Sequence, residues 1–429
     1  MKRIAQLLYL VVLINLSCSA QSTNSVHLKD VSKAEPVIVG AERIPVYVPL
    51  IKGKRVGIFA NQTSMVGNRH LVDTLQKLGV DIRVIFGPEH GFRGKADAGE
   101  KMGNEVDQKT GIRIVSLYGK KSKPSKEDLK DIDVLVFDIQ DVGTRFYTFI
   151  SSLEEFMNVA LEMGIPLMIL DRPNPNGHYI DGPVLDKKYK SFVGMQSIPV
   201  VYGLTIGEYA MMLAGERWLS DGANKKYDYY RVAENSKDTA FHFIVIKCKN
   251  YDHSTLYKLP VRPSPNLPDM GSIYWYPSTC FFEGTVLSEG RGTDKPFQII
   301  GHPALPKKLY SFTPNPTEGA KSSKLYGKKC YGWNLSGTDE QVLKSVNSRL
   351  QLDLLLKAYK LFPDKKNFFI LPKGGSGEQA FFNKLAGNSQ LMQQIKAGVS
   401  EEKIRQSWQA DLNAYKEVRK KYLLYEDFE

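Results

Sequence analysis

Strand-like and helix-like segments alternate through the first half of this 429-residue chain, and this alternation limits the fold more than any other feature. Runs rich in Val, Ile and Phe predict strands, and the segments between them carry leucines at helical spacing or a helix cap. Helices that separate successive strands are typical of a mostly parallel sheet covered on both faces. We therefore expect an α/β, Rossmann-like fold. The predicted strands are 55–60, 80–86, 112–119, 133–137 and 165–170, with 241–248 as a candidate sixth, and the predicted helices are 70–79, 125–132 and 152–164.

The pattern changes after about residue 285, where strands become shorter and Pro, Gly and Tyr more frequent. The chain closes with a run, 401–425, that predicts one long amphipathic helix. We expect two domains, a Rossmann-like domain over 37–285 and a smaller α+β domain over 286–429. The apolar face of the last helix is expected to be core and contains Ile404, Trp408, Leu412, Tyr415, Val418 and Tyr422.

The first 20 residues have the features of a secretory signal peptide. Lys2 and Arg3 precede an apolar run that is shorter than the roughly 20 residues of a membrane-spanning helix, and Cys-Ser-Ala comes just before Gln21. Residues 21–36 are polar and typical of a linker. The sequence therefore favours export, to the periplasm or to a membrane surface. A second processing site would make Cys18 a lipid-modified N-terminus that anchors the protein, and both options stay open.

The formal net charge of the chain is +12. A basic exported protein can favour anionic polymers such as cell wall, but lysines scattered over a solvated surface are the simpler explanation. No basic run is interleaved with aromatic residues, so we expect no nucleic-acid partner. Apart from Cys18, the cysteines are Cys248, Cys280 and Cys330, which form no CxxC pair. We expect them to be buried free thiols.

Motifs that hold a cofactor are absent from the sequence. The first predicted strand is followed by Asn-Gln-Thr-Ser rather than by Gly-x-Gly-x-x-Gly, and the chain has no Walker A motif. The seven histidines show no zinc-ligand spacing. We therefore expect neither a cofactor nor a metal. A serine hydrolase is disfavoured, because Ser64 with His90 is the one nucleophile–base pair that we could suggest.

Polar residues follow four of the predicted strands directly, on turns stiffened by Pro and Gly. The carboxyl ends of parallel strands share one edge of the sheet, where open α/β folds bind their ligands. The four turns therefore predict a polar cleft. Some of these groups have simpler explanations, since an aspartate can cap its own turn and an arginine can pair with a nearby aspartate. The candidates are Asn61, Glu89, His90, Asp138, Asp141, Arg145, Tyr147, Asp171, Arg172, Asn174 and Asn176.

A fifth cluster, residues 262–297, is dense in proline, aromatic and acidic residues. It lies near the predicted domain boundary and contains Glu283, Glu289 and Arg291. We expect this segment to fold over the cleft and to add aromatic walls.

Acids, amides and aromatic residues without a cofactor motif favour a carbohydrate ligand. Glycoside hydrolysis generally uses two carboxyl groups, one that protonates the leaving oxygen and one that acts as base or nucleophile. Glu89 is our candidate for the acid, because a glutamate between a proline and a histidine caps no turn, and His90 would support it. The second carboxylate stays open among Asp138, Asp141, Glu283 and Glu289, and so does the choice between retention and inversion.

Six ordered motifs resemble the NamZ-like exo-β-N-acetylmuramidases, glycoside hydrolase family 171. They are FGPEHGFRG, FDIQDVGTRFYTF, LDRPNPNG, YGLTIGEYA, PSPNLP and EGTVLSEGRGTDKPF, and the likeness runs from about residue 40 to the C-terminus. The resemblance implies a Rossmann-like catalytic domain without nucleotide and a C-terminal auxiliary domain. It also implies release of N-acetylmuramic acid from the non-reducing ends of peptidoglycan fragments, with Glu89 of the Pro-Glu-His-Gly motif as a catalytic residue.

Muramic acid carries a lactyl carboxylate, which an arginine can bind bidentately. Arg145, Arg172 and Arg291 are the candidates, because each belongs to one of the cleft motifs. The expected partner is therefore a peptidoglycan-derived saccharide. Two alternatives stay open, a non-catalytic sugar-binding lipoprotein of the envelope and a cell-wall esterase or amidase. The sequence does not predict the oligomeric state.

Overall fold

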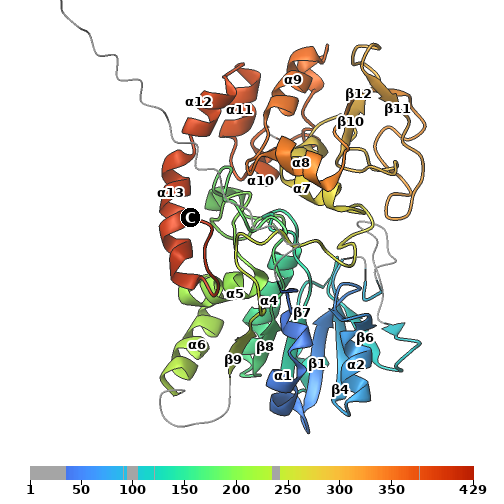
Figure 1. Ribbon diagram of the computed structural model, residues 1–429. Coiled ribbons are helices and arrows are strands. Elements are labelled where there is room, and N and C mark those ends of the chain that lie inside the picture. Colours follow the sequence, from blue (N-terminus) through green and yellow to red (C-terminus); the bar gives the residue numbers. More distant parts are fainter. Residues whose placement is uncertain (1–34, 90, 94–104, 120, 234–241, 376) are drawn as a thin grey trace, which may run out of the picture.

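A computed structural model describes residues 35–89, 91–93, 105–119, 121–233, 242–375 and 377–429. Its first half contains a seven-stranded sheet of order β5-β6-β4-β1-β7-β8-β9 (Figure 1). Every pair of neighbours is parallel except β5 and β6. The strands are β1 (Arg55–Ala60), β4 (Asp81–Gly87), β5 (Glu105–Val106), β6 (Arg113–Ser116), β7 (Val134–Asp138), β8 (Leu167–Leu170) and β9 (Phe243–Ile246). The predicted mostly parallel α/β sheet is confirmed, and each predicted strand is present.

Both faces of the sheet are buried, because side chains alternate along each strand. Val56 and Ile58 of β1 face one core, while Phe59 faces the other and stacks on Phe137 of β7 with ring centroids 5.0 Å apart. One face is covered by α1 (Ile44–Ile51) and α2 (Leu71–Lys77), and the other by α3 (Lys126–Leu129), α4 (Phe149–Glu162), α5 (Ile206–Gly215) and α6 (Asp221–Ala233). A short hairpin, β2 (Met65–Val66) and β3 (Arg69–His70), precedes α2.

The second half lies beyond the carboxyl ends of the parallel strands (Figure 1). It contains a three-stranded antiparallel sheet of order β10-β12-β11 and several short helices, as the α+β prediction requires. The strands are β10 (Ile299–His302), β11 (Tyr310–Phe312) and β12 (Cys330–Asn334). The helices are α7 (Met270–Thr279), α8 (Asp339–Val346), α9 (Asp353–Leu361), α10 (Phe381–Ala386), α11 (Gln390–Lys396), α12 (Glu401–Gln406) and α13 (Gln409–Arg419).

The prediction of a single long C-terminal helix is wrong, because the chain breaks between α12 and α13. Ser407 ends α12 by donating its hydroxyl to the Ile404 carbonyl, and Trp408 leaves helical geometry with φ −109° and ψ 0°. The break keeps Trp408 buried and turns α13 along the side of the first half (Figure 1). There the Tyr415 hydroxyl donates to the Tyr202 carbonyl at 2.6 Å.

The rest of the predicted apolar face is nevertheless core. Ile404, Leu412 and Tyr415 are buried, while Val418 and Tyr422 pack against the same core from partly exposed positions. The apolar spacing therefore predicted which side chains are buried but not that the helix axis changes direction.

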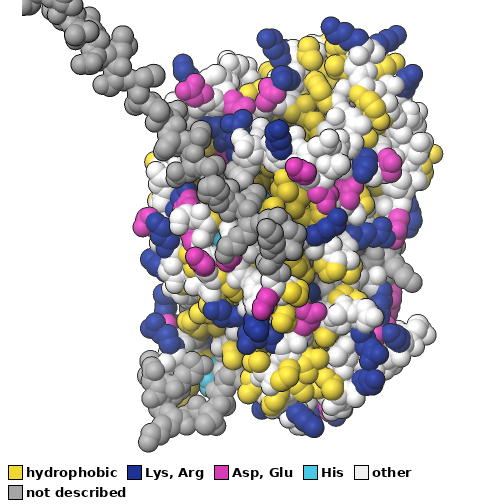
Figure 2. Space-filling model, in the orientation of Figure 1, with side chains coloured by type: hydrophobic (Ala, Val, Ile, Leu, Met, Phe, Trp, Pro, Cys, Tyr) yellow, Lys and Arg dark blue, Asp and Glu magenta, His cyan; other side chains and the backbone are white. Residues whose placement is uncertain are grey.

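Cys248, Cys280 and Cys330 are buried free thiols, as expected. Within the described ranges, every helix is too short or too polar to span a lipid bilayer. Basic side chains are spread over the face shown in Figure 2 with acidic side chains among them. The predicted signal peptide, most of the linker and Cys18 lie outside the described residues.

Candidate active site

A cleft of about 640 Å³ lies between the two halves of the molecule. Its first wall comes from the carboxyl ends of β4, β6 and β7, and its second wall comes from the segments around residues 264–267, 283–297 and 319–324. Aromatic side chains from both halves line it, namely Tyr118, Phe146, Tyr147, Phe149, Phe192, Tyr276, Phe297 and Phe381. Aromatic surfaces with a few polar groups are suited to holding a small polar ligand.

Glu89 enters the first wall from the turn that ends β4. The Gly91 N–H donates to the Pro88 carbonyl at 3.0 Å, and Gly91 has φ +74°, a backbone geometry that glycine adopts without strain. One carboxylate oxygen of Glu89 accepts a hydrogen bond from the Tyr118 hydroxyl at 2.8 Å, and the other lies 3.5 Å from the Thr148 hydroxyl. Burial and the charge of Glu89 raise the pKa of Tyr118, so its hydroxyl remains a donor. His90 lies outside the described residues.

The second wall holds a compact group of charges. Glu283 follows α7, and Nη1 of Arg291 lies 2.9 Å from its carboxylate and 3.2 Å from that of Glu289. Lys324 pairs with the other oxygen of Glu289 at 2.8 Å. The guanidinium of Arg291 rests over the ring of Phe297, 4.9 Å from its centroid. The predicted segment 262–297 therefore does reach the cleft.

The two glutamates of this wall have pKa values shifted in opposite directions. Burial raises the pKa of Glu283 in spite of the nearby Arg291. Burial acts on Glu289 as well, but Lys324 and Arg291 together lower its pKa. Glu289 is therefore held as a carboxylate, whereas burial makes Glu283 easier to protonate than an exposed glutamate.

Asp138 and Arg172 are buried in the interior and pair with each other. Arg172 donates to the Asp138 carboxylate through Nε at 2.5 Å and Nη2 at 2.9 Å, and the two side chains are 0% and 2% exposed. Neither residue lines the cleft. Their arrangement matches the structural alternative, an arginine paired with a nearby aspartate.

Asp141 and Arg145 are also enclosed in the interior. Asp141 accepts hydrogen bonds from the Tyr202 hydroxyl and from the Gly143 N–H, and burial raises its pKa to about 7. Arg145 donates to three backbone carbonyls, of Pro183, Ile198 and Leu385, at 2.7–2.8 Å. Arg145 therefore ties the first half to α10 rather than facing a ligand.

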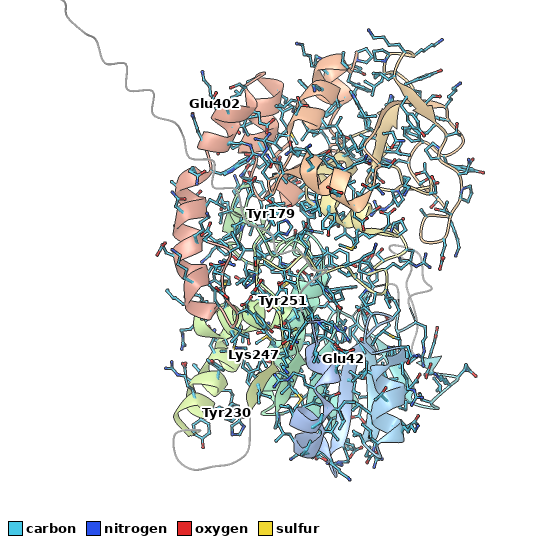
Figure 3. The ribbon with its side chains drawn as sticks, viewed as in Figure 1. Glu42, Tyr179, Tyr230, Lys247, Tyr251 and Glu402 are labelled. Carbon is cyan, nitrogen blue, oxygen red and sulfur yellow. The ribbon has the colours of Figure 1, made fainter. Side chains whose placement is uncertain are left out.

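Asp171 and the two asparagines after β8 hold the turns in place. Asp171 accepts from the Thr205 and Tyr425 hydroxyls and from the Gly207 N–H, and burial raises its pKa to about 6. Asn174 donates to the Leu204 carbonyl, and Asn176 donates to the Val142 and Ile273 carbonyls. The N–H of Asn174 also donates to the hydroxyl of Tyr251, which lies near the middle of the molecule (Figure 3).

The remaining candidates are either buried in the interior or line the cleft. Asn61 closes its own turn by accepting from the N–H and hydroxyl of Thr63, and it is fully buried. Ser64 is also buried and donates to the Asp138 carbonyl, so it does not present a nucleophile to the cleft. Tyr147 does line the cleft, and its hydroxyl donates a hydrogen bond to the Pro263 carbonyl at 3.0 Å.

The structure therefore brings Glu89, Tyr147, Glu283, Glu289 and Arg291 together and leaves the other described candidates in the interior. Further cleft residues were missed from the sequence, among them Tyr118, Lys324 and Phe381. Tyr118 follows β6 at the same sheet edge, a position that could have suggested it. Lys324 and Phe381 stand in segments without a motif, so only the folded chain places them.

The part of the chain that the structure describes contains no group of three His, Cys, Asp or Glu side chains that could hold a metal ion. What the cleft offers instead is carboxyl groups, cations and aromatic rings. That set can protonate a leaving group, activate water and hold an anionic ligand.

Comparisons with known proteins identify relatives of the whole chain. The chain is 38% identical over 397 residues to the peptidoglycan β-N-acetylmuramidase NamZ of Bacillus subtilis strain 168, which covers 89% of each chain. Two crystal structures of DUF1343 family proteins from Bacteroides fragilis NCTC 9343 are similar. The first is 44% identical, with a TM-score of 0.79, and the match covers 92% of this chain and 100% of that chain. The second is 27% identical, with a TM-score of 0.68, and the match covers 91% of this chain and 99% of that chain.

Family profiles match almost the whole described chain. The N-terminal domain of the exo-β-N-acetylmuramidase NamZ matches residues 56–271, and its C-terminal domain matches residues 274–425. The chain therefore belongs to the NamZ exo-β-N-acetylmuramidase family of glycoside hydrolases.

Proposed function

We propose that the chain is an exported exo-β-N-acetylmuramidase that releases N-acetylmuramic acid from the non-reducing ends of peptidoglycan fragments. The observation that carries the proposal is that a single cleft holds Glu89 from the end of β4 and Glu283 from the opposite half of the molecule. Glycoside hydrolysis needs two carboxyl groups at one site, and this cleft supplies them between aromatic walls. The name of the Bacillus relative supports a peptidoglycan substrate.

We assign the two chemical roles from the surroundings of each carboxyl group. Glu89 is the general acid, partly enclosed at the tip of a rigid turn and oriented by the Tyr118 hydroxyl. Glu283 is the second carboxylate, because it lines the cleft from the opposite half of the molecule and its side chain is 19% exposed. Glu289 is held by Lys324 and Arg291 and is 2% exposed, which leaves it little access to a water or a sugar.

Export is part of the same proposal. The leader-like first 20 residues support it, and the proposed substrate lies outside the cytoplasm. A lipid on Cys18 would hold the enzyme at a membrane surface, whereas cleavage before Gln21 would release it. Mass spectrometry of the mature N-terminus separates the two.

A pair of isomeric disaccharides tests the proposed specificity. One has N-acetylmuramic acid at the non-reducing end and N-acetylglucosamine at the other, and its isomer has the reverse order. We expect the enzyme to release free N-acetylmuramic acid from the first and to leave the second intact, as followed by chromatography and mass spectrometry. Cleavage of both isomers, or of neither, contradicts the proposal.

A further inference from the structure

Arg291 is the one arginine that lines the cleft among the described residues. The two other arginines that the sequence suggested for an anionic ligand are engaged elsewhere. Arg145 donates to backbone carbonyls in the interior, and Arg172 is closed in a buried pair with Asp138. Any recognition of a carboxylate by arginine at this site therefore falls to Arg291.

The hydrogen bonds of Arg291 leave one edge of its guanidinium unused. Both glutamates, Glu283 and Glu289, are bound through the same nitrogen, Nη1. Nε is buried without an acceptor, and the hydrogen bond and ion pairs described for Arg291 all run through Nη1. A buried donor left unpaired costs about 1–3 kcal/mol, and the Nε–Nη2 edge is a fork that matches a carboxylate. Phe297 beneath the guanidinium plane holds this edge in one orientation.

Lys324 is not available for the same task. Its ammonium group already donates to the carbonyls of Phe282, Thr285 and Leu287 at 2.6–3.0 Å, in addition to its pair with Glu289. Lys324 thereby neutralises Glu289 and ties its own segment to the chain that carries Glu283. The positive charge of Arg291 is then shared among Glu283, Glu289 and whatever occupies its unused edge.

We propose that the Nε–Nη2 edge of Arg291 binds the lactyl carboxylate of a terminal muramic residue, and that this contact selects muramic acid over glucosamine. The inference rests on the proposed function and adds the residue that reads the substrate. Glucosamine has a hydroxyl where muramic acid has the lactyl ether, so it has no anion for this edge. A bidentate pair between arginine and carboxylate adds both strength and direction.

A substrate carboxylate at Arg291 also affects Glu283, because the two anions would share one cation. The charged and titratable groups that face Glu283 are Arg291, Glu289, Lys324, Tyr276 and Cys280. A further negative charge among them makes protonation of Glu283 more favourable. The pKa of Glu283 should therefore be higher in the complex with a carboxylate substrate than in the complex with an uncharged one.

The first experiment changes the substrate and leaves the protein intact. A chromogenic N-acetyl-β-muramide is compared with its lactyl methyl ester, which keeps the bulk of the group and removes its charge. We expect kcat/KM of the wild type to fall about 30-fold for the ester, in the range of a charge-assisted hydrogen-bond pair. Equal kcat/KM for the acid and the ester overturns the inference and leaves the proposed function standing. Failure to cleave either substrate overturns the proposed function instead.

The second experiment changes the arginine. In Arg291→Gln we expect the preference for the acid over the ester to drop to within about 3-fold, because the cation is gone for both substrates. The matched control is Arg262→Gln, whose arginine pairs with Glu318 and does not line the cleft, and its preference should equal that of the wild type. A folded Arg291→Gln enzyme that keeps the full preference contradicts the inference. If this variant does not fold, the substrate comparison decides alone.

The pH profiles give a readout that a purely structural arginine would not move. Above about pH 5 a lactyl carboxylate is ionised, so the acidic limb of kcat/KM reports the free enzyme and should be the same for both substrates. The acidic limb of the kcat profile reports the enzyme–substrate complex. We expect this limb to lie at higher pH for the acid substrate than for the ester. If the wild type shows the same acidic limb of kcat for both substrates, the proposal that Glu283 and the substrate carboxylate share Arg291 is contradicted.

Discussion

The substitution Asp138→Asn tests whether this strand-end aspartate serves stability or catalysis. It keeps the shape of the side chain but leaves the guanidinium of Arg172 buried without its counter-charge, in a pair with exposures of 0% and 2%. Breaking a buried pair from one side costs about 3–5 kcal/mol. At roughly 2.1 cal/mol/K per residue, the entropy of unfolding of a chain of this size converts 4 kcal/mol into a fall in Tm of roughly 5 °C.

The assay is a thermal melt followed by tryptophan fluorescence, together with kcat measured well below the melting temperature. We expect Asp138→Asn to lower Tm by that amount and to keep kcat within about 3-fold of the wild type, because Asp138 does not line the cleft. Replacing both partners by apolar residues, in Asp138→Leu/Arg172→Met, should recover most of the lost stability. A variant with the wild-type Tm and a collapsed kcat would refute the structural reading and restore Asp138 as a catalytic candidate.

Three further predictions follow from other contacts. Tyr118→Phe removes the hydroxyl that donates to Glu89, and we expect kcat to fall about 10-fold with KM unchanged; an unchanged kcat would show that this bond does not orient the acid. Asp141 has a pKa raised to about 7, so the folded state binds more protons than the unfolded chain between about pH 4 and 7, and stability falls as pH rises through this window. Asp141→Asn should flatten that fall in urea titrations at several pH values, and a slope equal to the wild type would contradict it. Tyr425→Phe removes the hydroxyl that donates to the buried Asp171 and should lower the free energy of unfolding by about 1–3 kcal/mol in the same titrations. An unchanged free energy of unfolding would show that this C-terminal contact is dispensable.

The parallel sheet was predictable because each buried strand is a continuous apolar run followed by a turn. The run at 133–137 and the polar residues after it became β7 and its loop almost residue for residue. The break at Trp408 was not predictable, because apolar spacing is the same on both sides of a bend and only the packing of α13 on the first half requires it. Periodicity reports which side faces the core, while tertiary contacts decide where a helix stops.

The site was predictable only in part, for a related reason. Polar residues at the edge of a sheet are needed both to bind ligands and to satisfy the backbone of irregular turns, and sequence does not separate the two uses. Asn176 and Glu89 both follow strands, yet Asn176 bonds two interior carbonyls while Glu89 reaches the cleft. Lys324 comes from a segment more than thirty residues from the nearest predicted candidate, so no local motif could have indicated it.

The role of Glu89 as the acid that protonates the leaving oxygen is tested most directly by changing the leaving group in Glu89→Gln. A disaccharide leaves as a poor alkoxide and needs the proton, whereas 4-nitrophenolate needs little help. We expect kcat to fall about 10³-fold on the disaccharide and only roughly 10-fold on the nitrophenyl muramide, with Glu402→Gln on α12 as the exposed control at wild-type rates. An equal loss on both substrates, or no loss on the disaccharide, would contradict the assignment of Glu89 as the general acid.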